Sequence, residues 1–358
     1  MGERNLEVLI NGDLAPIVLF TYNRPRHTKA TLDALKANHL VKQSVLYIYQ
    51  DGLKENATKE QRESVLEVDS YLQDFITSNE NSKYFKEITL IQRERNFGLA
   101  DSIIDGVTNI INKYGTIIVL EDDIVVSPVF LDFMNAALSN YKDQPKVWSI
   151  AGWGYPITTQ DLGTATFGES HTAGVGQVGV IDGNILSVIC LWILKTLLTK
   201  ATLPINLDGA ADYFSHFTLN HKGKLKTWAI FNYLIAHKHN ALVLCPSISY
   251  IHQIGFDGSG VHCGEEGNML NPPSINTKFP IIFPKDIAES ALALDRIRSF
   301  ELVHKNTIPR RIRHKLVKVS TALQTKLSHL IVCRGGGYRL SPVAYTSISY
   351  NHDESRAA

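Results

Sequence analysis

The sequence predicts an α/β fold with a mixed, mostly parallel sheet flanked by helices, and three observations lead to this class. Short apolar runs alternate with amphipathic stretches through residues 1–150, which is the order of strands and helices in a parallel sheet. The run before Glu121 is apolar throughout, as in a strand that is buried on both faces. Several of these apolar runs are followed directly by polar side chains. This is typical of parallel sheets, in which ligands bind beyond the carboxyl ends of the strands.

The first strand is the apolar run Ala15–Thr21, and it ends in a polar loop that carries Arg24. A helix over Thr28–Asn38 follows, because Leu32 and Leu35 stand at helical spacing. This order places Arg24 at the carboxyl edge of the predicted sheet.

The next three strands follow the same pattern. Strands and intervening helices alternate as Val45–Tyr49, Lys59–Ser78, Glu87–Ile91, Asp101–Tyr114 and Thr116–Leu120, and a helix over Pro128–Tyr141 comes after them. The second strand ends at Asp51 and the fourth at Glu121-Asp122-Asp123. Arg24, Asp51 and the acidic cluster are therefore expected to meet at one sheet edge.

Composition indicates a folded protein whose main partner is not nucleic acid. Of 358 residues, 44% are hydrophobic and 20% charged, which excludes generic disorder. Residues 301–358 hold ten Lys or Arg against three acids, whereas residues 1–300 are mildly acidic. A mildly acidic body argues against nucleic acid, and a basic tail suggests an anionic surface.

The cysteines and the N-terminus predict a cytoplasmic protein. Four cysteines lie far apart without a CxxC pair, so neither a zinc site nor a disulfide framework is expected. Charged residues interrupt Met1–Leu14, which is unlike a signal peptide. The longest apolar stretch, Ile185–Leu198, is too short to span a bilayer and is interpreted as a buried helix or strand pair.

The acidic cluster predicts a divalent metal ion. Three adjacent carboxylates after a buried strand repel one another, and a bound cation removes that cost. Oxygen ligands without His or Cys suit Mg²⁺ or Mn²⁺, which water and substrate phosphates then complete. The alternative is a solvated acidic turn before the helix Pro128–Tyr141, where acids favour the helix N-terminus.

Several blocks of sequence, taken together and in order, carry a resemblance. They are FTYNRP (20–25), YQDG (49–52), RERNFGLADSI (93–103), IIVLEDDIVVSPVF (117–130), VWSIAGW (147–153) and IGFDGSGVHCG (254–264). With them the chain resembles GT-A glycosyltransferases, Rossmann-like nucleotide-diphospho-sugar transferases. It is most similar to the manganese-dependent N-acetylglucosaminyltransferase family of protein glycosylation and its bacterial relatives.

The resemblance implies roles for the residues at the sheet edge. Asp123 would coordinate Mn²⁺, or Mg²⁺, bridging the phosphates of a UDP-sugar, with Asp122 near the ribose. Asp51 would accept hydrogen bonds from uracil or ribose, and Arg24 would lie against the diphosphate, in the same block as the donor-binding Thr21. A guanidinium suits a diphosphate and a carboxylate suits ribose or base N–H groups. The plainer interpretations are a surface arginine and an Asp-Gly turn.

Two further segments are expected to contact the donor. Arg95 or Asn96 would touch it from the strand-to-helix turn before Leu99, whose plainer interpretation is a capped helix start. The Gly-rich stretch 254–264 would form a loop that closes over the donor, with Ser259 and His262 near phosphate or metal. His262 in a loop is otherwise simply exposed to solvent.

Inverting transfer needs a base that takes the proton from the acceptor hydroxyl. Asp208 and Asp212 are the candidates, and Asp212 is preferred because relatives have an acid followed by an aromatic there. The alternative is that either residue caps the following helix. The segment Ala173–Ser187 departs from the Trp-rich pattern of relatives, which puts the sugar pocket and activity in doubt.

These expectations combine into a domain plan and a function. Residues 15–150 would bind the nucleotide-sugar and 151–285 the acceptor, followed by a basic helical extension (286–335) and a tail (336–358). Basic and apolar residues alternate over 308–330, as in a helix that lies on the inner membrane face or one that docks on the core. The expected reaction is metal-dependent, inverting transfer of a hexose or N-acetylhexosamine to a glycan or glycolipid in surface polysaccharide synthesis. A non-catalytic nucleotide- or glycan-binding relative and a sugar nucleotidyltransferase are the alternatives.

Overall fold

The computed structural model describes residues 14–168, 179–180, 205–260 and 270–305. Residues 1–305 form one compact unit and residues 306–358 a second. Several predicted features lie outside the described residues: the apolar stretch 185–198, the atypical segment 173–187, His262, the helix 308–330 and the tail 336–358. No helix among the described residues is both long and apolar enough to cross a membrane.

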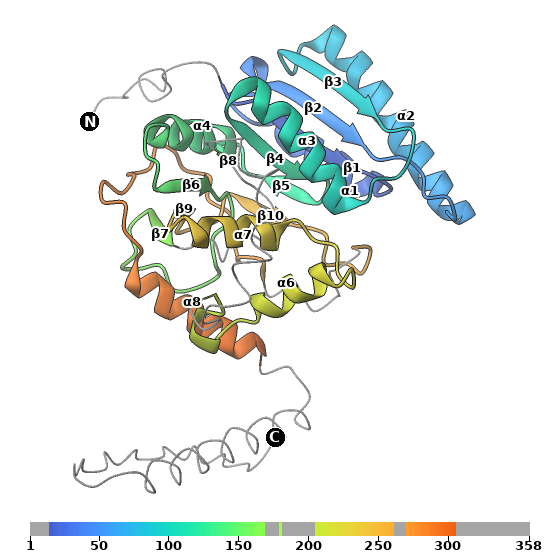
Figure 1. The fold of residues 1–358 in the computed structure, drawn as a ribbon. Coiled ribbons are helices and arrows are strands. Elements are labelled where there is room, and N and C mark those ends of the chain that lie inside the picture. The colour runs from blue at the N-terminus through green and yellow to red at the C-terminus, as the bar shows by residue number, and fades with distance from the viewer. Residues whose placement is uncertain (1–13, 169–178, 181–204, 261–269, 306–358) are drawn as a thin grey trace, which may run out of the picture. The chain divides into compact units, whose positions relative to one another are not determined.

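The predicted alternation of strands and helices is confirmed in the first half of the chain (Figure 1). Its elements are β1 (Ile17–Thr21), α1 (Pro25–Lys36), η2 (Val41–Gln43), β2 (Val45–Gln50), α2 (Lys59–Ser82), β3 (Glu87–Gln92), α3 (Leu99–Tyr114), β4 (Ile117–Glu121), β5 (Ile124–Val126) and α4 (Phe130–Tyr141).

Helix ends differ from the predicted ones for local reasons. α1 begins at Pro25 rather than Thr28, because proline at the first helical position has a fitting φ and no N–H to leave unpaired. α2 begins as predicted, where Thr58 and Gln61 form a reciprocal capping box. α4 begins at Phe130 rather than Pro128, since the short strand β5 extends the chain after the acidic cluster.

The second half has shorter elements. They are β6 (Val147–Ile150), β7 (Ala165–Gly168), β8 (Gly179–Val180), η4 (Leu207–Gly209), α6 (Tyr213–His221), α7 (Ala229–Lys238), β9 (Leu242–Pro246), β10 (Ile251–Gln253) and α8 (Ala291–Lys305). Ile297 of α8 is buried in the main core cluster, so residues 286–305 are packed with the rest of the first unit.

The main sheet is mixed, as predicted. Its strand order is β3-β2-β1-β4-β8-β6-β9-β7. The first four strands are parallel, whereas β8 runs antiparallel to β4 and β6, and β7 antiparallel to β9. A separate two-stranded sheet pairs β10 with β5, so that Gln253 lies opposite Ile124.

Both faces of the parallel strands are buried. In β1, Ile17 and Leu19 pack with apolar residues of α1 and α2, whereas Val18 and Phe20 pack with those of α3. Figure 1 shows α3 and α2 on opposite faces of this part of the sheet. With both faces covered, the carboxyl ends of the strands are the free edge where polar side chains can gather.

Candidate active site

Arg24 joins the ends of β1 and β4. Its Nη1 donates to Asp123 Oδ2 at 3.0 Å and its Nε to Asp122 Oδ2 at 3.3 Å, and Nη2 also pairs with Asp122 Oδ1. The parallel register sets Phe20 beside Glu121, so the residues that follow both strands emerge together. The prediction that Arg24 and the acidic cluster meet at one edge is therefore confirmed.

The arginine carries much of the charge compensation that sequence reasoning assigned to a metal. Although burial opposes the charge of Arg24, Asp122 and Asp123 raise its pKa above the usual value. Burial raises the pKa of Asp122, and Arg24 opposes that shift. Thr31 of α1 donates to the backbone carbonyl of Asp122 at 2.8 Å, which fixes the turn after β4.

Glu121 lies in a different environment from the two aspartates. The Nε1 of Trp228 donates to Glu121 Oε1 at 3.3 Å. Burial, together with the charges of Asp123 and Asp122, raises the pKa of Glu121 to about 8. Trp228 precedes α7 and no sequence signal singled it out, so its contact with the cluster is a product of the tertiary fold.

The segment after β10 crosses directly over Asp123. The backbone N–H of Ile254 donates to the carbonyl of Asp123 at 2.9 Å. A Cβ on Gly255 would lie 2.1 Å from Asp123 Oδ2 and 3.2 Å from Arg24 Nη1. Only glycine fits this approach, which gives a physical reason for the glycine in the IGFDG block.

Asp51, after β2, holds the turn between β3 and α3. Its Oδ1 accepts from the backbone N–H groups of Gly52 (3.0 Å) and Phe97 (2.8 Å). Its Oδ2 accepts from the N–H of Gly98 (3.0 Å) and the amide of Asn96 (2.9 Å). Four N–H groups thus donate hydrogen bonds to the Asp51 carboxylate. Asp51 therefore positions the β3–α3 turn, which was predicted to contact the nucleotide-sugar.

Gly52 and Asn96 complete that turn. A Cβ on Gly52 would lie 2.4 Å from the carbonyl carbon of Arg95, so the Asp-Gly pair serves a close approach of two loops rather than a plain turn. The Asn96 amide also donates to the carbonyl of Gly52 at 2.8 Å. Thr21 is buried, and its hydroxyl bonds to the side chain of Gln50 within the same edge.

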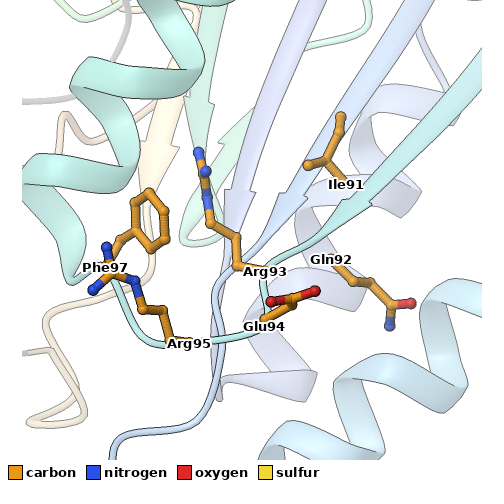
Figure 2. A pocket seen from close by; sticks show the side chains of 6 residues that line it. All are labelled: Ile91, Gln92, Arg93, Glu94, Arg95 and Phe97. Carbon is orange, nitrogen blue, oxygen red and sulfur yellow. The ribbon is translucent and has the colours of Figure 1, made fainter.

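A cavity of about 470 Å³ lies beside this turn, lined by Ile91, Gln92, Arg93, Glu94, Arg95 and Phe97. Figure 2 shows the guanidinium groups of Arg93 and Arg95 beside the ring of Phe97, at 4.1 and 5.3 Å from its centroid. Arg95 is exposed, so its charge is available to a ligand in the cavity.

The two candidate bases have different surroundings. Asp208 pairs with Arg298 of α8. Asp212 is exposed and precedes α6 without a side-chain capping bond; Asn206 instead accepts the N–H of Phe214 at 2.9 Å. The capping interpretation of Asp212 is therefore not supported, and no contact within the described residues joins it to Asp123.

The free carboxylate oxygen at this edge of the sheet fits a divalent ion that is bound by a single carboxylate. No group of three or more His, Cys, Asp or Glu side chains in the described part of the chain forms a metal-binding cluster. The Oδ2 of Asp123 pairs with Arg24, and its Oδ1 has no hydrogen-bond partner among the described residues. A single free carboxylate oxygen suits Mg²⁺ or Mn²⁺ completed by water and phosphate oxygens.

Comparison with known proteins supports a glycosyltransferase. A model of the GNT-I family matches residues 3–164, which contain Arg24, Asp51 and the acidic cluster. The resemblance inferred from the motifs is confirmed by this match. No curated protein sequence matches the chain.

The solved structures that are similar to this chain include the following three. Mannosyltransferase PcManGT from Pyrobaculum calidifontis, in complex with GDP-Man and Mn²⁺, is 12% identical with a TM-score of 0.27, over 42% of this chain and 47% of that one. S. aureus TarS 1–349 is 13% identical with a TM-score of 0.39, over 67% and 60%. An active-site mutant of LgtC is 12% identical with a TM-score of 0.29, over 62% and 70%. The match thus spans about half of PcManGT and three fifths of TarS 1–349.

Proposed function

We propose that this protein is a metal-dependent inverting glycosyltransferase. It moves a hexose or N-acetylhexosamine from a UDP-sugar to a hydroxyl of a glycan or glycolipid in surface polysaccharide synthesis. The observation that carries the proposal is the contact of Arg24 with Asp122 and Asp123 across the ends of β1 and β4. That edge is where α/β sheets bind nucleotides, and the family match covers all three residues.

Asp123 is the protein ligand of the metal, through the carboxylate oxygen that Arg24 leaves free. The divalent ion, Mn²⁺ or Mg²⁺, supplies positive charge to the diphosphate of the leaving nucleotide. Arg24 keeps both aspartates oriented and adds a second positive charge at the same place. Asp122, held by Arg24 through both carboxylate oxygens, would lie near the ribose of the donor.

The nucleoside end of the donor lies along the turn that Asp51 holds. Asn96 and Arg95 face this end of the sheet from the β3–α3 turn, and Thr21 lines the edge between β1 and β2. Four N–H groups already donate hydrogen bonds to Asp51. Its main contribution to binding of the nucleotide-sugar is therefore to fix the β3–α3 turn. The ring of Phe97 contacts the guanidinium groups of Arg93 and Arg95, and the exposed Arg95 offers its positive charge to the donor.

Asp212 is the general base. Its carboxylate is exposed and has no helix-capping role, whereas Asp208 is committed to Arg298. It takes the proton of the acceptor hydroxyl as that oxygen attacks the anomeric carbon from the face opposite the diphosphate. The bond between the anomeric carbon and the diphosphate oxygen breaks, UDP leaves with that bonding pair, and the centre is inverted. His262, which lies outside the described residues, is proposed to touch the phosphates or the metal.

The test is nucleotide release from a panel of UDP- and GDP-sugars with Mn²⁺, without and with glycan acceptors. Asp123→Ala should abolish metal-dependent release, whereas Asp143→Ala, which removes an exposed acid elsewhere, should leave it intact. Asp212→Asn should lower transfer by about 10²- to 10⁴-fold while donor binding persists. Donor binding without turnover in the wild type would instead indicate a non-catalytic relative. Metal-dependent release that Asp123→Ala retains would refute the assigned metal site.

A further inference from the structure

His27, in the first turn of α1, contacts the segment after β10 that crosses Asp123, the candidate metal ligand. Its Nε2 lies 3.1 Å from the backbone carbonyl of Ile254 and 3.2 Å from Asp257 Oδ2. Only 11% of the His27 side chain is exposed. Both partners are acceptors, so Nε2 must carry a proton that it shares between them.

The same segment is held from its other side by the acidic cluster. The N–H of Ile254 donates to the carbonyl of Asp123, while the carbonyl of Ile254 accepts from His27. Pairing of β10 with β5 delivers the chain to this point. Residue 254 is thereby fixed between α1 and the end of β4, one residue before Gly255.

Asp257 is oriented to receive His27. Its Oδ1 accepts from the N–H and the hydroxyl of Ser259, at 3.0 and 2.6 Å, which leaves Oδ2 for the imidazole. The hydrogen bonds from Ser259 lower the pKa of Asp257, so the carboxylate remains ionised and a good acceptor. His27 thus binds both ends of the segment Ile254–Asp257.

We propose that His27 is a positioning residue that clamps Ile254–Asp257 onto α1 and so keeps the backbone of Gly255 against the carboxylate of Asp123. The inference rests on the proposed function, in which Asp123 holds the metal. Because a Cβ at residue 255 would already overlap Asp123 Oδ2, small movements of this segment change which orientations the carboxylate can adopt. The clamp therefore sets the orientation of Asp123 without touching the metal or the substrate.

The experiment measures Mn²⁺ affinity by electron paramagnetic resonance of free Mn²⁺, on the full chain with saturating UDP. His27→Ala should weaken Mn²⁺ binding by about tenfold, from the loss of one shared hydrogen bond. His27→Gln, whose side-chain amide can donate to the same acceptors, should restore most of it. His239→Ala, an exposed histidine at the end of α7, is the matched control and should bind Mn²⁺ as the wild type does.

The outcomes separate the clamp from the metal site. Unchanged affinity in His27→Ala, beside lost binding in Asp123→Ala, overturns the clamp and leaves the metal site standing. Wild-type affinity in Asp123→Ala overturns the metal site itself. If circular dichroism shows that His27→Ala does not fold, Asp257→Ala carries the test, because that side chain is half exposed. It should weaken Mn²⁺ binding about threefold, and unchanged affinity there overturns the clamp.

Discussion

Asp51→Asn changes one oxygen of a buried carboxylate into an NH2 group and should open the turn between β3 and α3. Each carboxylate oxygen accepts two N–H donors. In either orientation of the new amide, its NH2 therefore faces two donors instead of accepting from them. Asn96 can relieve one clash by rotating its own amide, but it then loses its bond to the Gly52 carbonyl.

The free-energy cost of Asp51→Asn comes from the hydrogen bonds that cannot be kept in any orientation of the new amide. At least two hydrogen bonds are lost, and those that remain lose the charge of their acceptor. At about 1–1.5 kcal/mol for each bond, and more for charge-assisted ones, the turn should lose about 2–4 kcal/mol. This range corresponds to about 30- to 1,000-fold faster opening of the turn, at 1.36 kcal/mol for each factor of ten.

Hydrogen exchange of the Phe97 and Gly98 amides measures that opening directly. Asp69→Asn is the matched control, because the same chemical change there affects a single, long hydrogen bond of 3.4 Å to Gln92. Exchange at Phe97 and Gly98 should rise in Asp51→Asn and stay unchanged in Asp69→Asn. Protection equal to the wild type in Asp51→Asn would refute the assignment of Asp51 as the residue that holds the turn.

Three further predictions follow from other parts of the structure. Asp132→Asn should stabilise the protein at pH 7, because burial raises the pKa of Asp132 in the folded state. Above the unfolded-state pKa of 3.8, ionisation of the buried carboxyl group costs the folded protein stability, and this cost grows as pH rises. Chemical denaturation should show that this gain shrinks toward pH 4, and an equal gain at both pH values would contradict the account. Gly255→Ala should weaken Mn²⁺ binding by about tenfold or more, since the Cβ of the new alanine overlaps Asp123 Oδ2. A metal titration in which the folded variant binds Mn²⁺ as tightly as the wild type would contradict this. Glu301→Leu should lower turnover several-fold while Glu301→Gln retains it, because the side-chain carbonyl of Gln can still accept the hydroxyl of Tyr213, the residue that follows Asp212 in the chain. Equal turnover of the two variants in steady-state kinetics would argue against this supporting role of Glu301.

Much of the first half could be predicted because its signals are local. Apolar runs bounded by polar residues identified β1 to β4, and helical spacing identified the helices between them. The shared edge of parallel strands then predicts that Arg24 lies near Asp122 and Asp123. The short strand β5 was missed because three residues after an acidic turn carry too little pattern, and its pairing with β10 is a contact between distant parts of the chain.

The partners of each site residue could not be predicted in this way. Arg24 was expected against a diphosphate, yet it compensates the two aspartates in the protein alone. Asp51 was expected to bind the nucleoside, and in the structure it accepts four donors from the β2–α2 and β3–α3 loops. Both contacts with a donor remain predictions. Trp228 and His27 were not candidates at all, because neither belongs to a motif whose spacing indicates chemistry.

The sequence by itself determined the order of strands and helices, the edge at which charged residues gather and the acidic cluster at the end of β4. Those features depend on hydrophobic periodicity and on residues adjacent in the chain. Only the tertiary structure decided that Gly255 passes over Asp123, that Trp228 reaches Glu121 and that α8 packs into the core of the first unit. Such contacts join residues far apart in the chain, and their energies depend on packing distances that no local pattern encodes.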